Sequence, residues 1–182
     1  ESLFICGGNG AGKTTLLKLI AGLYAPSSGI LLLNGEPVTP ANTGQYREFF
    51  AMIFNDPYLM KQLYGLKDFD PELEKALLAE LQLDHKTTLS DGRFTTTKLS
   101  TGQRKRLAYA ISRLRDRDIY IFDEFAADQD PQFRAYFYTS LLPVLKRQGK
   151  TIIAVTHDER WFGVGDRLLK LEYGKIVPMD LS

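Results

Sequence analysis

The sequence has almost no cysteine: Cys6 is its single thiol, so no disulfide can form within the chain. It lacks an apolar run of the roughly 18 residues that a membrane-spanning helix needs, and we expect no signal peptide among the residues given. It also lacks an excess of either charge, because 23 Lys and Arg against 22 Asp and Glu leave a net charge of +1. These absences suit a reducing compartment, and they give no support to a protein that binds nucleic acid or a membrane surface.

The 182 residues are 44% hydrophobic, enough for one substantial core with a subdomain and too few for two full domains. We therefore expect one α/β domain. The chain begins at Glu1 rather than at methionine and reaches its first glycine-rich motif almost at once. We expect that an N-terminal portion precedes the sequence given.

That glycine-rich motif carries the strongest chemical signal. Residues 7–14 read Gly-Gly-Asn-Gly-Ala-Gly-Lys-Thr and fit the pattern G-x-x-x-x-G-K-[ST] of a phosphate-binding loop. A strand is expected before it, at 3–6, and a helix after it, at 15–21. Glycines let backbone N–H groups converge on an anion, Lys13 can reach the β- and γ-phosphates, and Thr14 offers its hydroxyl to Mg²⁺. The alternative, a glycine-rich turn with a chance lysine, is disfavoured by the flanking strand and helix.

Other apolar runs and turn signals predict the remaining strands. Three runs have the length of buried parallel strands: residues 49–54, 119–122 and 151–156. Hairpins are expected at 29–38, at the edge of the sheet with Asn34-Gly35 as its turn, and at 167–177. We predict an α/β phosphate-loop fold, with a mainly parallel sheet flanked by helices and a small antiparallel edge hairpin.

Helix signals complete the outline. Asp70 and Pro71 begin a helix, and Ser100 with Gln103 has the spacing of a capping box at the start of another. A third helical pattern runs from 133 to 145, with Pro143 expected to end or kink it. We expect a catalytic core of residues 1–55 and 118–182, and an inserted helical subdomain of residues 56–117.

Two polar stretches lie in the predicted subdomain. Residues 85–98 are rich in threonine and are expected to form a loop. The helix after Ser100 is expected to bury Leu107, Ile111 and Leu114 and to carry a row of cations on a solvated face; these are Arg104, Lys105, Arg106, Arg113, Arg115 and Arg117. A nucleic-acid surface is the less favoured alternative for these cations.

Ionisable residues follow two of the predicted strands. Asp123 and Glu124 end the run at 119–122, and His157 follows the run at 151–156. Parallel strands deliver such residues to the carboxyl edge of the sheet, where ligands bind. A solvated strand end and a structural histidine are the alternatives.

With these motifs in this order, and with Leu99-Ser100-Thr101-Gly102-Gln103 between them, the chain resembles the nucleotide-binding domain of an ATP-binding cassette (ABC) protein. The resemblance covers almost the whole chain, although Thr101 departs from the usual LSGGQ signature. It implies that Asp123 holds Mg²⁺ together with Thr14, that Glu124 is the general base for ATP hydrolysis, and that His157 contacts the γ-phosphate, with Lys13 as the third catalytic residue.

The resemblance also implies a nucleotide site shared between two subunits. The signature segment of one copy would cap the nucleotide held by the other, so that a head-to-tail dimer with a second nucleotide-binding domain holds two ATP molecules. The implied nucleotide-binding residues are Gly7, Asn9, Gly10, Ala11, Gly12, Lys13, Thr14, Thr15, Ser100, Gly102, Gln103 and Asp130. Asn55 stands where the family has a glutamine that reaches Mg²⁺, and the aromatic residue that stacks on adenine would precede the chain.

A narrower resemblance concerns residues 100–107, residues 122–131, and the pairs Phe133-Arg134 and Phe137-Tyr138. These look like the branch of ABC exporters that carries cyclic peptides and siderophores. That branch fuses an upstream transmembrane domain to the ATPase domain, which would place this domain on the cytoplasmic face of the cell membrane, the inner membrane of a bacterium. No nucleic-acid partner is implied. The alternatives are a soluble ABC ATPase with no role in transport, a kinase or GTPase outside the family, and a nucleotide-binding module that is inactive alone.

Overall fold

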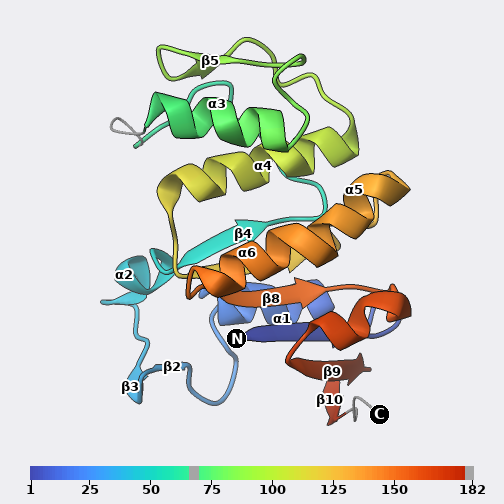
Figure 1. The fold of residues 1–182 in the computed structure, drawn as a ribbon. Coiled ribbons are helices and arrows are strands. Elements are labelled where there is room, and N and C mark those ends of the chain that lie inside the picture. The colour runs from blue at the N-terminus through green and yellow to red at the C-terminus, as the bar shows by residue number, and fades with distance from the viewer. Residues whose placement is uncertain (66–69, 179–182) are drawn as a thin grey trace.

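A computed structural model of the chain describes residues 1–65 and 70–178 (Figure 1). Its main sheet has six strands in the order β10-β9-β1-β8-β7-β4. All neighbours pair in parallel except β9 and β10, which form an antiparallel hairpin at one edge. The strands are β1 (Ser2–Cys6), β4 (Phe50–Ile53), β7 (Ile119–Asp123), β8 (Thr151–Val155), β9 (Arg167–Glu172) and β10 (Lys175–Pro178). The predicted fold class, a mainly parallel α/β sheet of phosphate-loop type, is confirmed.

Strand register brings the predicted site residues to one edge of this sheet. Val155 at the end of β8 pairs with Ile5 on β1 on one side and with Asp123 on β7 on the other. The three central strands therefore end at the same level, so the segments that follow them lie side by side. Those segments are the phosphate loop, Glu124 and His157.

Both faces of the sheet are covered, and the alternation of each strand assigns its side chains to two cores. On one face, Phe4, Phe122 and Ala154 join a large aromatic-rich core with the helices of residues 71–147. On the other face, Ile5 and Ile121 pack with Leu17 of α1. The phosphate loop is thus held between a buried strand and a buried helix, which fixes its position relative to the strand ends.

Helices form at every predicted place. They are α1 (Lys13–Ile20), α2 (Thr43–Arg47), α3 (Pro71–Glu80), α4 (Thr101–Arg115), α5 (Pro131–Tyr136) and α6 (Leu142–Arg147), with a π-helical turn at Phe137–Leu141 and a 3₁₀ helix at Glu159–Val164. Pro143 was expected to end or kink its helix. The helical backbone instead continues through Pro143 to Arg147, because Leu141 and Leu142 both keep right-handed helical angles. A π-helical turn directly precedes the proline, and this departure from regular α-helix lies where proline disrupts the i→i−4 hydrogen bonds. In Figure 1, α3 and α4 lie next to one another beyond the β4 edge of the sheet, and both belong to residues 56–117. The division into a catalytic core and a helical subdomain stays a prediction.

Three local predictions need correction. The hairpin predicted at 29–38 forms as β2 (Leu32–Leu33) and β3 (Glu36–Pro37), but in a separate two-stranded sheet, and the antiparallel edge of the main sheet is β10. The segment predicted as a loop at 85–98 contains a hairpin, β5 (Leu89–Ser90) and β6 (Arg93–Phe94). The run at 49–54 was expected to be a fully buried strand; β4 is an edge strand, and it buries only alternate side chains.

None of the helices among residues 1–65 and 70–178 combines the length and apolar character of a membrane span.

Candidate nucleotide site

The phosphate loop connects β1 to α1, and three of its glycines adopt backbone angles that other residues avoid. Gly7 has φ 145°, Gly10 has φ 76° and Gly12 has φ 97°. A Cβ on Gly7 would lie 2.2 Å from the backbone oxygen of Leu171 on β9. Lys13 is 6% exposed, and its Nζ donates to the backbone oxygens of Gly7 (2.9 Å) and Gly8 (3.0 Å). The ammonium group therefore lies inside the curl of the loop, where a phosphate group would contact it.

Thr14 and Asp123 form the second part of the site. The Thr14 hydroxyl donates to Asp123 Oδ2 at 2.9 Å, although the two residues come from distant parts of the chain. Asp123 is 2% exposed, and burial raises the pKa of its carboxyl, while the hydrogen bond from Thr14 opposes this effect. A hydroxyl and a carboxylate held together at the end of a helix and a strand form an oxygen donor set of the kind that Mg²⁺ prefers.

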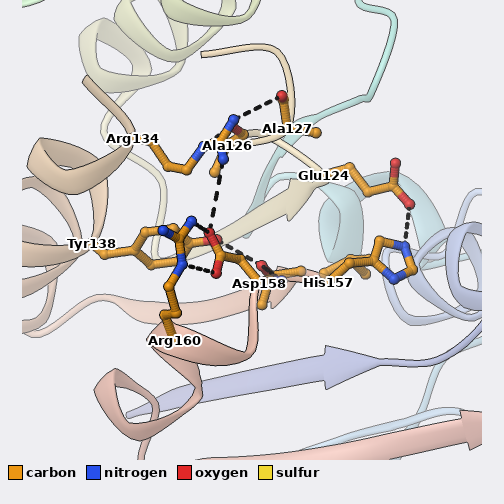
Figure 2. A pocket seen from close by; sticks show the side chains of 10 residues that line it. Glu124, Ala126, Ala127, Arg134, Tyr138, His157, Asp158 and Arg160 are labelled. Atoms are coloured by element: carbon orange, nitrogen blue, oxygen red, sulfur yellow. Dashed lines mark hydrogen bonds and ion pairs between the residues drawn. The ribbon is translucent and has the colours of Figure 1, made fainter. Parts of the chain in front are cut away.

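Glu124 follows β7 in a left-handed backbone conformation, with φ 51°, which is uncommon for a residue other than glycine. Its Oε1 is 3.0 Å from His157 Nε2 and 4.0 Å from Lys13 Nζ. Figure 2 shows the first of these contacts, with the two side chains pointing toward one another from the ends of neighbouring strands. The three residues predicted to be catalytic are therefore brought together by the fold.

A cleft of about 410 Å³ opens above the loop. Its lining residues are Asn9, Gly10, Gly12, Lys13, Thr14, Thr15 and Glu124. In the described part of the chain, no side chain caps the N-terminus of α1, so backbone N–H groups of its first turn have no side-chain acceptor. Ala11 does not line the cleft: it is buried in the core below the loop, and its N–H donates to the backbone oxygen of Gly8 at 3.2 Å. The open helix end, the lysine and the Thr14-Asp123 pair fit a magnesium-bound phosphate chain.

A second hollow, of about 330 Å³, lies beside Glu124 and His157 (Figure 2). Asp158 lines it and accepts two hydrogen bonds from Arg160, at 2.8 and 2.7 Å, which together hold the pKa of its carboxyl below the ordinary value. Arg134 Nη1 is 3.9 Å from the same carboxylate. The charges in this hollow largely neutralise one another, so it offers no strong anion site.

The signature segment builds the start of α4. Ser100 and Gln103 form the predicted capping box: each side chain bonds the other residue's backbone N–H, at 3.3 and 3.1 Å. A Cβ on Gly102 would lie 2.5 Å from the backbone oxygen of Asp128, so the first turn of α4 packs directly on the segment after β7. Among the described residues, no hydrogen bond or ion pair joins Ser100, Gly102 or Gln103 to the phosphate loop of the same copy.

Two of the basic residues on α4 are buried, against expectation. Lys105 is 0% exposed and Arg106 is 7% exposed, so they do not belong to a solvated face. Leu107 is buried as predicted, and Gly102, Lys105, Arg106, Tyr109 and Ala110, which recur at helical spacing, complete the buried face of α4. This spacing was visible in the sequence, but the two charges concealed it because cations are seldom fully buried.

Arg106 links α4 to the segment that begins α5. Its Nη2 donates to Asp130 Oδ2 at 2.6 Å and its Nε donates to Gln129 at 2.8 Å, while the guanidinium lies 3.6 Å from the centre of the Phe133 ring. Burial lowers the pKa of Arg106, and the bond to Asp130 opposes that effect. Asp130 also caps α5 through the Phe133 N–H, and this bond, followed by Arg106, lowers the pKa of its carboxyl. Its two oxygens are thus used within this copy of the chain.

Asn55 lies near the end of β4, as predicted, but its amide oxygen has a partner that the sequence did not suggest. Lys105 Nζ donates to Asn55 Oδ1 at 2.7 Å. That oxygen is the only side-chain atom of Asn55 suited to binding Mg²⁺. Binding of a metal by Asn55 remains a prediction. A metal ion at this position would have to share the Asn55 oxygen with Lys105 or displace the Lys105 ammonium from it.

The fold and site together define a nucleotide-binding protein of the phosphate-loop class. The family model described as "ABC transporter" matches residues 1–127, and the chain belongs to this family. The family binds ATP, so the chain is an ATP-binding domain of the ABC type.

Two relatives have similar sequences. The chain is 48% identical over 181 residues to the ATP-binding protein SyrD of Pseudomonas syringae pv. syringae, a match that covers 97% of the chain and 32% of SyrD. It is 31% identical over 188 residues to the ATP-dependent lipid A-core flippase of Burkholderia orbicola (strain AU 1054), with 97% and 31% covered. The chain therefore spans about a third of the length of these relatives.

Two solved structures share the fold. The chain matches cbiO1 from Clostridium perfringens, described as part of the ABC transporter complex cbiONQ, with a TM-score of 0.76 and 27% identity, covering 97% of this chain and 75% of that one. It matches a bacterial Atm1-family ABC exporter with ATP bound with a TM-score of 0.82 and 22% identity, covering 97% of this chain and 33% of that one.

Proposed function

We propose that this domain hydrolyses ATP and that hydrolysis drives export through a membrane-embedded part of the same protein. The observation that carries the proposal is the position of the Glu124 carboxylate between Lys13 and His157, at the mouth of the phosphate cleft. Phosphoryl transfer needs groups that position water and neutralise charge more than it needs covalent chemistry. A cation, a carboxylate and an imidazole, those of Lys13, Glu124 and His157, lie together at this cleft.

Each residue has a defined role in this proposal. Lys13 and the N–H groups at the start of α1 bind phosphate oxygens, and Thr14 with Asp123 holds Mg²⁺. Bound Mg²⁺ would supply charge neutralisation at the phosphates. Glu124 accepts a proton from the attacking water and keeps that water in line, and His157, fixed by its hydrogen bond to Glu124, contacts the γ-phosphate.

The signature segment is proposed to act on a second copy. Its residues do not contact the phosphate loop of their own chain, and the start of α4 presents a capped helix N-terminus that is exposed at Ser100. We infer a head-to-tail dimer in which Ser100, Gly102 and Gln103 cover the nucleotide of the partner copy, with Asp130 at the same interface. An exposed helix N-terminus suits this role because it attracts phosphate.

The similarity to an ATP-dependent lipid A-core flippase supports an exporter rather than a soluble ATPase. We propose an upstream transmembrane domain and a location on the cytoplasmic face of the cell membrane. The narrower sequence resemblance favours a cyclic peptide or siderophore as the cargo. A soluble ABC ATPase and a module that is inactive alone are the remaining alternatives. Reconstitution of the intact protein in vesicles, with cyclic peptide and siderophore cargoes compared, would separate them.

Replacing Glu124 tests the proposed hydrolysis. In the intact protein, Glu124→Gln should keep ATP binding, because the phosphate contacts remain, and should lose about 10²–10⁴-fold in hydrolysis, because the amide cannot accept the proton. Steady-state phosphate release and equilibrium titration with ATP measure the two effects, and size-exclusion chromatography with ATP should show a stabilised dimer. Glu159→Gln, an exposed glutamate on the 3₁₀ helix, is the matched control and should hydrolyse normally. Normal turnover by Glu124→Gln would end this proposal.

A further inference from the structure

Lys105 is the feature of the site that the ABC resemblance did not anticipate. Its side chain is 0% exposed, and its Nζ donates to three acceptors: Asn55 Oδ1 at 2.7 Å, the backbone oxygen of Glu124 at 2.7 Å, and Asp128 Oδ2 at 2.5 Å. A lysine ammonium has three N–H donors, so each has a partner. The acceptors belong to three segments: the end of β4, the end of β7, and the turn before α5.

Simple stabilisation does not account for this arrangement. Removing a cation from water is costly, and only one of its three partners is charged: Asp128, whose side chain is 42% exposed. A buried ion pair is often no more stable than an apolar residue of similar size. The geometry therefore favours a role in fixing conformation.

The conformation concerned is that of Glu124. Its left-handed backbone, with φ 51°, is strained for a residue with a side chain, and such strain persists only where neighbouring groups hold it. Lys105 binds the carbonyl of this same residue. The Ala127 N–H also donates to this carbonyl, at 3.2 Å. If the charged 2.7 Å bond from Lys105 is lost, the longer bond from Ala127 holds the peptide after Glu124 less firmly, and the carboxylate moves away from His157 and Lys13.

We propose that Lys105 is a positioning residue for ATP hydrolysis, which holds Glu124 in its left-handed conformation and ties it to Asn55 and Asp128. The inference rests on the proposed role of Glu124. Through its one ammonium group, Lys105 connects the backbone of Glu124 to the end of β4 and to the turn before α5. Lys105 itself does not contact the phosphate cleft, since it is absent from the lining of that cleft.

The test compares Lys105→Met with Lys150→Met in the intact protein. Lys150 is a matched control, because it is also a largely buried, ion-paired lysine, 13% exposed and 2.9 Å from Asp116 Oδ1. It lies just before β8, at the amino ends of the parallel strands and away from the nucleotide site. Lys105→Met should lower kcat by about 10- to 100-fold, the cost of a small misplacement, while KM for ATP stays within about threefold because the phosphate contacts remain. Lys150→Met should lower the melting temperature and leave kcat unchanged.

Two measures separate positioning from misfolding. We express kcat per ATP-binding site, counted by equilibrium titration, so that unfolded protein does not contribute. If Lys105→Met does not fold, Lys105→Gln, which keeps two donors on a shorter side chain, takes its place with the same expected fall in kcat. A double-mutant cycle with Asn55→Ala should be non-additive in kcat, since both substitutions break the same hydrogen bond.

The outcomes are distinct. An unchanged kcat per site in the Lys105 variant, or additive effects in the cycle, would overturn the inference while leaving the role of Glu124 intact, provided that Glu124→Gln is inactive in the same assay. If Glu124→Gln hydrolyses ATP at the normal rate, the proposed function fails and the inference fails with it.

Discussion

At the scale of the residue, the site depends on side chains whose partners lie far away in sequence. Lys13 is held by two carbonyl groups of its own loop and lies 4.0 Å from Glu124, so a cation and the proposed base share one small space. Glu124 is in turn held through its backbone by Lys105. Each contact is individually modest, but together they leave the Glu124 carboxylate few other positions.

Removing the ammonium of Lys13 should weaken nucleotide binding. Lys13→Ala loses a charge-assisted contact to phosphate, worth about 1.5–3 kcal/mol, so the Kd for ATP should rise by about 10- to 100-fold. Equilibrium titration with ATP measures this change. Lys18→Ala, on the same helix but directed at Tyr24, is the control and should bind normally. Equal affinity of the two variants would show that Lys13 does not contact the phosphates.

At the scale of the element, α4 combines two roles. Its exposed N-terminus is closed by the Ser100-Gln103 capping box, and its buried stripe carries Lys105 and Arg106 toward the segment after β7. The carboxylates that receive these cations, Asp128 and Asp130, belong to that one segment. Two ion pairs therefore join the signature helix to this segment.

Loss of the cap should destabilise this helix measurably. Ser100→Ala removes the acceptor of the Gln103 N–H and should lower the free energy of unfolding by about 1 kcal/mol. Ser112→Ala, in the middle of the same helix, removes only a bond to the carbonyl of Ala108 and should cost less, because alanine favours helix. Urea denaturation of both variants provides the comparison. An equal loss in the two variants would mean that the cap contributes nothing of its own.

At the scale of the whole molecule, contacts between segments that are distant in the sequence hold the sheet and its helices together. Asp166, just before β9, accepts from the backbone N–H of Ser2 at 2.8 Å and pairs with Lys146 on α6. The pairing with Lys146, followed by the bond from Ser2, lowers the pKa of Asp166 to about 2, from an ordinary value of 3.8. This carboxylate therefore ties β1, α6 and β9 together at the edge opposite the nucleotide site.

Stability should depend on the charge of Asp166 in acid. Because its pKa is lowered in the folded protein, its contribution is present above pH 3.8 and is lost as the pH falls toward 2. The difference in melting temperature between the wild type and Asp166→Asn should therefore be largest at pH 5 and above and should shrink in more acidic buffer. Asp91→Asn, in the exposed turn between β5 and β6, should show no such trend. A difference that stays constant down to pH 2 would contradict the assignment.

The sequence by itself determined the phosphate loop, the strands that end in Asp123 and before His157, the Ser100 cap and the parallel fold class. These follow from local rules: glycine where φ is positive, alternation of apolar residues, and polar residues at the ends of buried runs. Such signals lie within a few neighbouring residues, so they can be read without knowing the tertiary structure.

Only the tertiary structure decided what the buried cations do. Lys105 and Arg106 look solvated in the sequence because a charge is expected in water, and their acceptors lie some 20 to 50 positions away along the chain. The separate β2-β3 sheet and the edge position of β4 were also beyond local rules, since strand partners are chosen by packing across the whole molecule. Contacts between distant segments bring the local motifs together into one site. The hydrogen bonds of Lys105 to three separate segments are the part of this site that no local pattern in the sequence predicts.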